Sequence, residues 1–170
     1  MQVSTAIARD QWYVAAYASE IGDELFARTI CAEPLVLYRT SAGVAVALAD
    51  RCVHRRFPLS RSNRVGDDIV CGYHGFTYDC SGTCVAVPGQ TRIPRTARVP
   101  AYPVVEQDGF VWVWIGDPDR ARPAQVPRAP WLVQEGWTTE CGMEPLAARH
   151  ALLMDNLIDR KSGVEGKSVD

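Results

Sequence analysis

The stretches Cys52-Val-His-Arg-Arg-Phe-Pro-Leu-Ser60 and Val70-Cys-Gly-Tyr-His-Gly-Phe76 each place one cysteine and one histidine within four residues. The chain has 3 histidines, and two of them lie in these motifs. A [2Fe–2S] cluster takes four protein ligands, and two imidazoles in place of two thiolates raise its reduction potential to roughly −150 to +300 mV. We predict such a mixed-ligand cluster, with one iron on Cys52 and Cys71 and the other on His54 and His74.

A Cys2His2 zinc site is the alternative for the same four residues. Zinc fingers normally pair cysteine with cysteine and histidine with histidine, whereas each motif here mixes the two ligand types, which favours iron and sulfur. Glycine at 72 and 75 would let backbone N–H groups approach the cluster sulfurs. The Val-Pro-Gly run at 87–89 is a candidate third loop that shields the cluster.

Short apolar runs separated by turn residues fill the chain from about residue 12 to 116, which predicts an antiparallel sandwich or barrel. The expected strands are 12–17, 34–39, 43–49, 68–71 and 110–115. The fold class we expect is mainly β, an antiparallel sandwich with a cluster-binding subdomain, followed by a fragment of an α+β domain. The spacing of Leu146, Leu153, Met154 and Leu157 predicts a helix over about 145–159.

Four segments follow from these patterns. Residues 10–116 form the cluster domain, and 117–135, with repeated prolines, form a linker. Residues 136–159 begin a second domain, and 160–170 form a disordered tail.

Composition and charge indicate which partners and which cellular compartment to expect. The net charge of −2 predicts no binding to nucleic acid, and neither a signal peptide nor a membrane span is recognisable, so we expect a cytoplasmic protein. In that reducing compartment the 6 cysteines argue for metal ligands or free thiols, including Cys80 and Cys84, rather than disulfides.

The two motifs resemble the cluster loops of Rieske non-haem iron oxygenases, in particular the oxygenase subunits of vanillate O-demethylase and toluenesulfonate methyl-monooxygenase. The flanking runs 12–16, 87–90 and 109–114 agree, and the likeness covers residues 10 to 159. Two positions depart from the family pattern, which has Pro where Val53 stands and Gly where Arg56 stands. Neither supplies a ligand, so the resemblance still implies a Rieske cluster.

Two other Rieske classes fit less well. The subunits of quinol-oxidising complexes carry an extra cysteine in each ligand loop and a membrane anchor, neither of which is found here. The small Rieske ferredoxins normally end near residue 116, whereas this chain continues to residue 170.

The resemblance weakens near the C-terminus. Asp155-Asn-Leu-Ile-Asp159 matches the start of the family's mononuclear iron motif, and Asp159 then stands at the carboxylate that bridges electrons between subunits. Ser162 and Lys167 stand where the family has its two iron-binding histidines. We therefore expect no mononuclear Fe(II) site, with His150 an ordinary helix residue. A truncated gene with an unrelated tail explains this ending, and a divergent short protein is the alternative.

The function that the resemblance implies is the iron–sulfur component of an NADH-dependent aromatic monooxygenase. Its partner would be a flavin and iron–sulfur reductase, and its substrate an aromatic acid oxidised at a methyl or methoxy group, within a homo-oligomer. Enzymatic activity of the chain as it stands is left open by the missing ligands. The alternative is a Rieske electron carrier or a non-functional remnant.

Overall fold

The computed structural model describes residues 7–140, 142–143, 145–148 and 150–158, in two units, of which the first is 8–138. The strands of the first unit are β1 (Gln11–Tyr17), β2 (Phe26–Ile30), β3 (Glu33–Arg39), β4 (Ala45–Ala49), β5 (Asn63–Val65), β6 (Asp68–Val70), β7 (Thr77–Tyr78), β8 (Cys84–Ala86), β9 (Ala101–Tyr102), β10 (Val104–Gln107) and β11 (Phe110–Ile115). Its short 3-10 helices are η1 (Ala18–Glu20), η2 (Leu59–Arg61), η3 (Pro118–Arg120), η4 (Pro123–Gln125) and η5 (Pro130–Leu132). The second unit contains α1 (His150–Ile158).

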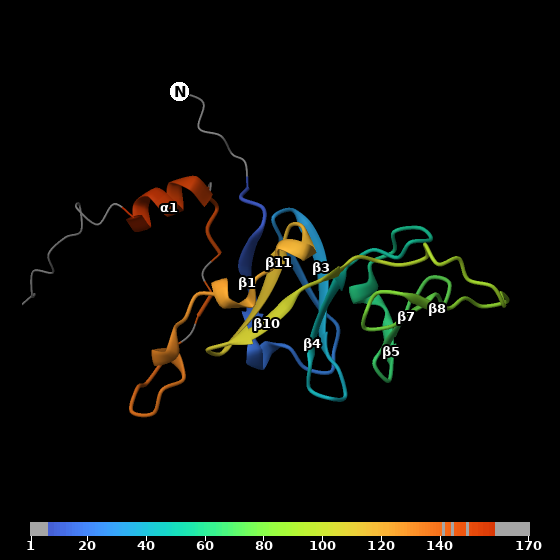
Figure 1. Cartoon of the computed structure of the whole chain (residues 1–170), viewed down its shortest axis with the longest axis horizontal. Helices are drawn as coiled ribbons and strands as arrows, with labels where there is room; N and C mark the ends of the chain where they lie inside the picture. Colours follow the sequence, from blue (N-terminus) through green and yellow to red (C-terminus); the bar gives the residue numbers. More distant parts are fainter. Residues whose placement is uncertain (1–6, 141, 144, 149, 159–170) are drawn as a thin grey trace, which may run out of the picture. The chain divides into compact units, whose positions relative to one another are not determined.

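Three antiparallel sheets build the first unit, with strand orders β1-β11-β10, β2-β3-β4-β9 and β5-β6-β7-β8. Side chains of the first two sheets share one hydrophobic core, which makes these sheets a sandwich. The small third sheet lies beside the sandwich (Figure 1). The predicted mainly β fold is thus confirmed, and the subdomain is a sheet of its own rather than loops alone.

Strand β3 contributes to both hydrophobic cores of this unit, because side chains on both of its faces are buried. Leu35 and Leu37 belong to the sandwich core, whereas Val36 and Tyr38 belong to a second core that faces the third sheet. Successive side chains of a strand point to opposite faces, so the uninterrupted apolar run at 35–38 serves both cores. The second core also contains Cys52 and Cys71.

All five predicted strands are present, with small shifts at their ends. The strand expected at 68–71 ends at Val70, because Cys71 already belongs to the loop that follows. Asp108 and Gly109 both have positive φ, 51° and 85°, as a two-residue hairpin turn between β10 and β11 requires. Strand β2 was not predicted, nor were the short strands β5 and β7–β10, whose two to four residues carry too little periodicity.

Residues 117–135, for which we predict a linker, lie against the sandwich. The Trp12 indole Nε1 donates a hydrogen bond to the Arg122 carbonyl at 3.0 Å, and the Gln107 amide donates to the carbonyl of Pro127 at 2.9 Å. Val126 is buried. The segment boundaries given above remain predictions.

Helix α1 is shorter than the sequence predicts, because residues 145–148 are not helical. Leu152, Leu153 and Met154 are exposed, and a short helix without tertiary packing is only marginally stable. Asp159 and the tail 160–170 lie outside the described residues. None of the described helices has the length and hydropathy to cross a membrane.

Candidate metal centre

The two cysteine–histidine motifs form loops with the same backbone. In ligand loop 1 (52–57) the Cys52 N–H donates to the Phe57 carbonyl and the Arg56 N–H donates to the Cys52 carbonyl, both at 2.9 Å. In ligand loop 2 (71–76) Cys71 and Phe76 form the equivalent bond at 2.8 Å, and the Gly75 N–H donates to the Cys71 carbonyl at 2.9 Å. The cysteines therefore hold equivalent positions in both loops, whereas the histidine is the third residue of loop 1 (His54) and the fourth of loop 2 (His74).

This closure requires a left-handed residue at the fifth position of each loop. Gly75 has φ of 70° and Arg56 has φ of 56°. Glycine adopts this region freely, whereas a residue with a β-carbon does so at a cost of roughly 1–2 kcal/mol. Arg56 is thus a strained residue in the place where its twin loop has glycine.

Both cysteine thiols are buried in the second core, each 2% exposed. Burial raises the pKa of the Cys71 thiol, and a hydrogen bond with the neighbouring Cys52 thiol raises it further. The backbone N–H groups of Tyr73 and His74 point at the Cys71 thiol and act in the opposite direction, because they stabilise a thiolate. The two thiols are adjacent, as two ligands of one iron must be.

The Tyr78 side chain contacts the first of these thiols from β7. Its hydroxyl lies 3.0 Å from the Cys52 Sγ and accepts a hydrogen bond from the Val53 N–H at 3.1 Å. Burial, and then the contact with Cys52, raises the pKa of Tyr78, so the hydroxyl keeps its proton. With its oxygen accepting from Val53, the hydroxyl proton is free to be donated to sulfur. Sequence reasoning missed this residue, since only the pairing of β7 in the third sheet brings it to Cys52.

The two histidines form a second pair, at the surface. The ring centroids of His54 and His74 are 4.7 Å apart, and both residues are exposed. The His54 ring stacks on Phe76 with a centroid distance of 5.0 Å, which orients it from the opposite loop. Thiols inside and imidazoles outside are the arrangement by which a bound group could exchange electrons with a partner.

Three further contacts hold the loops in place. The nearly buried Asp50 carboxylate accepts from both the backbone N–H and the hydroxyl of Ser60, each at 2.6 Å, and so ties the two ends of ligand loop 1. The Ser62 hydroxyl accepts from the Gly72 N–H at 3.1 Å, which links the exit of loop 1 to loop 2. Pro88 packs on Gly75, so the predicted third loop lies against ligand loop 2.

The donor set fits a two-iron cluster. A [2Fe–2S] group with mixed ligation needs two thiolates on one iron and two imidazoles on the other, and the structure brings the four side chains together as these two pairs. Within the described residues, no three His, Cys, Asp or Glu side chains are placed to hold a single metal ion. The ligand assignment itself remains our prediction.

The remaining candidates are not at this centre. His150 and Asp155 are exposed residues of α1 in the second unit, and Asp159, Ser162 and Lys167 lie outside the described residues. Cys80 and Cys84, at the two ends of the β7–β8 hairpin turn, are free thiols, as expected.

Comparison with known proteins agrees with this geometry. The profile of the Rieske [2Fe–2S] domain family matches residues 11–103. The chain is 43% identical, over 89% of its length and 44% of the relative, to the toluene-4-sulfonate monooxygenase system iron-sulfur subunit TsaM1 of Comamonas testosteroni. It is 38% identical to the vanillate O-demethylase oxygenase subunit of Pseudomonas sp. (strain HR199 / DSM 7063), over 89% of its length and 42% of the relative.

A solved structure matches as well. The crystal structure of dicamba monooxygenase with non-heme iron and dicamba superposes with a TM-score of 0.72 at 41% identity, over 75% of this chain and 39% of that one. The chain spans less than half the length of these relatives.

Proposed function

The chain belongs to the Rieske [2Fe–2S] domain family, and we propose that Cys52, His54, Cys71 and His74 hold the cluster of an aromatic oxygenase component. The observation that carries this proposal is the pairing of two buried thiols and two exposed imidazoles on loops with one backbone geometry.

The residues around the ligands have separable tasks. When bound, the cluster would take up and release one electron at a time. Cys52 and Cys71 would hold it in a hydrophobic core that excludes water, and the Tyr78 hydroxyl, 3.0 Å from the Cys52 sulfur, would donate a hydrogen bond to the thiolate. His54 and His74 face the surface, where an electron donor can approach.

The activity of the complete protein is inferred from its relatives, whose names refer to toluenesulfonate, vanillate and dicamba. We propose oxidation of a methyl or methoxy group on an aromatic acid by O2, with NADH electrons delivered by a flavin and iron–sulfur reductase. In a homo-oligomer of that protein, Asp159 would carry electrons to the mononuclear iron of the neighbouring subunit. The described residues contain the four proposed cluster ligands but no set of three ligands for a single metal ion.

Anaerobic reconstitution with ferrous iron and sulfide tests the cluster. We expect two irons and two acid-labile sulfides per chain, and an electron paramagnetic resonance signal of mixed histidine and cysteine ligation after reduction with dithionite. Bound zinc without sulfide, or colourless protein, would contradict the proposal.

A second measurement separates the oxygenase from the electron carrier. With a reductase, NADH and vanillate or toluenesulfonate, the oxygenase consumes O2 and releases a demethylated or hydroxylated product. A cluster that is reduced and reoxidised without product would establish the carrier instead.

A further inference from the structure

The charges of this chain are distributed unevenly. Residues 51–100, which contain both ligand loops, have eight arginines and three aspartates and neither lysine nor glutamate. The whole chain has 18 basic and 20 acidic residues, so the rest of it is clearly acidic. A positive region around the candidate metal centre therefore stands out against a negative background.

The arginines of the two regions also differ in their partners. Outside residues 51–100, five of the six arginines of the first unit form ion pairs: Arg9 with Glu33, Arg28 with Glu20, Arg39 with Glu106, Arg120 with Asp10 and Arg128 with Asp108. Among the described residues of 51–100, only Arg64 forms one, with Asp67.

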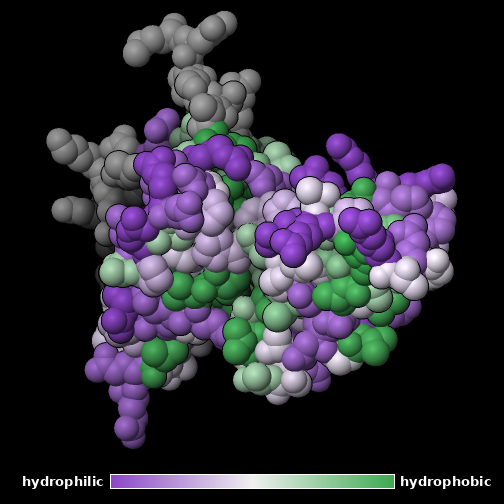
Figure 2. Space-filling model, turned by 45° about the vertical axis from the view of Figure 1, so that its right-hand side comes forward, coloured by the Kyte–Doolittle hydropathy of each residue, from purple (hydrophilic) through white to green (hydrophobic). Residues whose placement is uncertain are grey.

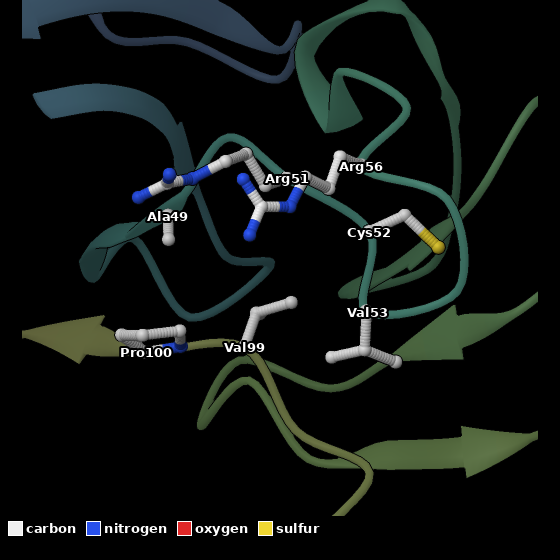
Figure 3. Close-up of a pocket in the computed structure, with 7 residues that line it drawn as sticks. All are labelled: Ala49, Arg51, Cys52, Val53, Arg56, Val99 and Pro100. Carbon is white, nitrogen blue, oxygen red and sulfur yellow. The ribbon is translucent and has the colours of Figure 1, made fainter.

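Two of the unpaired arginines line one pocket. A cavity of about 380 Å³ is bounded by Arg51 and Arg56, by the backbone of ligand loop 1 at Cys52 and Val53, and by small apolar side chains on the far wall. Figure 3 shows both guanidinium groups on the same side of this pocket, facing Val99 and Pro100, while the Cys52 sulfur points away. The pocket thus presents positive charge immediately beside the ligand loop, without access to the thiol.

Among the described residues, no ion pair joins Arg51 or Arg56 to a neighbouring carboxylate. The Asp50 carboxylate is bonded to Ser60. Glu33, on whose pKa Arg51 acts at longer range, is held by Arg9 and by the Tyr102 hydroxyl. The two guanidinium groups are left with their hydrogen-bonding capacity directed at the pocket and at solvent.

The backbone of Arg56 supplies an independent observation. Its left-handed conformation would suit glycine, the residue that ligand loop 2 has at the equivalent Gly75. A strained residue that persists at a site usually serves a function there. Since the loop closes equally well with glycine, the feature that Arg56 adds is its side chain.

We propose that the pocket formed by Arg51 and Arg56 binds a carboxylate side chain of an acidic electron-donor protein that docks over ligand loop 1. This inference rests on the proposed function, in which one electron passes from the reduced donor to the group held by the four ligands and no bond is made or broken. Two guanidinium groups can together donate several charge-assisted hydrogen bonds to the two oxygens of one carboxylate. The surrounding arginines attract an acidic surface and accelerate its encounter.

An acidic protein fits better than a small anion or an apolar partner. One small anion would neutralise a single pocket and leave Arg55, Arg61, Arg92, Arg95 and Arg98 unpaired. In Figure 2, which turns the side of the third sheet forward, hydrophilic and hydrophobic residues alternate there in small patches. An extended acidic surface would complement the several arginines that a small anion leaves unpaired.

The test uses a plant-type [2Fe–2S] ferredoxin, an acidic one-electron donor, with the reconstituted chain. For Arg56→Gly and for Arg51→Gln we expect the second-order rate of electron transfer at low ionic strength to fall about fivefold, with a shallower dependence on salt. The double variant should lose less than the product of the two, because both arginines hold the same carboxylate. Arg128→Gln, which removes an exposed charge that pairs with Asp108 of the β10–β11 turn, is the matched control and should leave the rate unchanged.

Equilibrium binding of oxidised ferredoxin, measured by calorimetry, provides a readout that needs no electron transfer. If Arg56→Gly binds ferredoxin and accepts electrons as the wild type does, the proposed docking pocket is wrong, whereas the proposed cluster is unaffected. If sulfate stabilises the wild type but not Arg56→Gly, and ferredoxin binding is the same in both, the pocket is a small-anion site and the proposal fails. If the chain forms no cluster, the proposed function is wrong. The calorimetric measurement of ferredoxin binding would still show whether the arginine pocket is a docking site.

Discussion

Ligand loop 1 and ligand loop 2 close with the same two backbone hydrogen bonds, yet their left-handed residues are Arg56 and Gly75. The surroundings explain the difference. A β-carbon on Gly75 would lie 2.9 Å from the Pro88 Cγ, whereas the Arg56 side chain extends into an open pocket. In loop 2 both the left-handed conformation and the lack of space for a β-carbon favour glycine. In loop 1 only the conformation favours glycine, and the contribution of a functional side chain can outweigh that preference.

Removal of one thiol should have the largest effect. Cys71→Ser takes away a buried, proposed ligand of loop 2 and should abolish the cluster, since a neutral hydroxyl is a poor substitute for a thiolate. Cys80→Ser is the control, because that cysteine is exposed and outside the loops. Iron and acid-labile sulfide per chain are the measurement, and a Cys71→Ser protein with the full complement would exclude Cys71 as a ligand.

The requirement for glycine in loop 2 is tested by Gly75→Ala. Left-handed strain together with the contact to Pro88 should lower the free energy of unfolding by about 2–3 kcal/mol. In a Pro88→Ala background the contact is removed and only the strain remains, so the cost should fall to about 1 kcal/mol. Urea denaturation measures both. Equal costs in the two backgrounds would show that Pro88 does not confine this loop.

An intermediate effect is expected from Tyr78→Phe, which affects only the Cys52 side of the pair. Because burial raises the pKa of Tyr78, its hydroxyl stays protonated and donates to sulfur. A donor favours the more negative, reduced state, so its loss should lower the reduction potential by about 40 mV, equivalent to about 1 kcal/mol for one electron.

Redox titration of the visible absorption measures this shift. The control is Tyr73→Phe, because Tyr73 belongs to ligand loop 2 and its ring packs against His74. An unchanged potential in Tyr78→Phe would mean that this hydroxyl does not interact with the ligand sulfur.

The smallest effect should come from Arg56→Gly, which makes loop 1 like loop 2. Relief of left-handed strain is partly offset by the greater backbone freedom of glycine in the unfolded chain, so the gain in unfolding free energy should be at most about 1 kcal/mol. Urea denaturation again measures it. A clear loss of stability would show that the Arg56 side chain holds the loop itself, which would undermine its assignment to a docking pocket.

Much of the fold and of the centre could be predicted from local patterns. The uninterrupted apolar run of β3, the aromatic and β-branched run of β11 and the Asp108-Gly109 turn each mark their element without reference to the rest of the chain. Of the third sheet only β6 could be predicted; β5, β7 and β8 could not, because they are defined by their partners rather than by periodicity. The start of α1 was placed too early because helical spacing says nothing about whether a helix finds a surface to pack on.

The sequence by itself determined which four residues are the candidate ligands, since the mixed pairing of cysteine and histidine is a chemical signature that needs no coordinates. Only the tertiary structure decided that the thiols are buried and the imidazoles exposed, that Tyr78 reaches Cys52, and that Arg51 and Arg56 share a pocket. The reason is physical: ligand chemistry is a property of residue types, whereas burial, hydrogen-bond partners and the neighbours of a charge depend on segments distant in the chain.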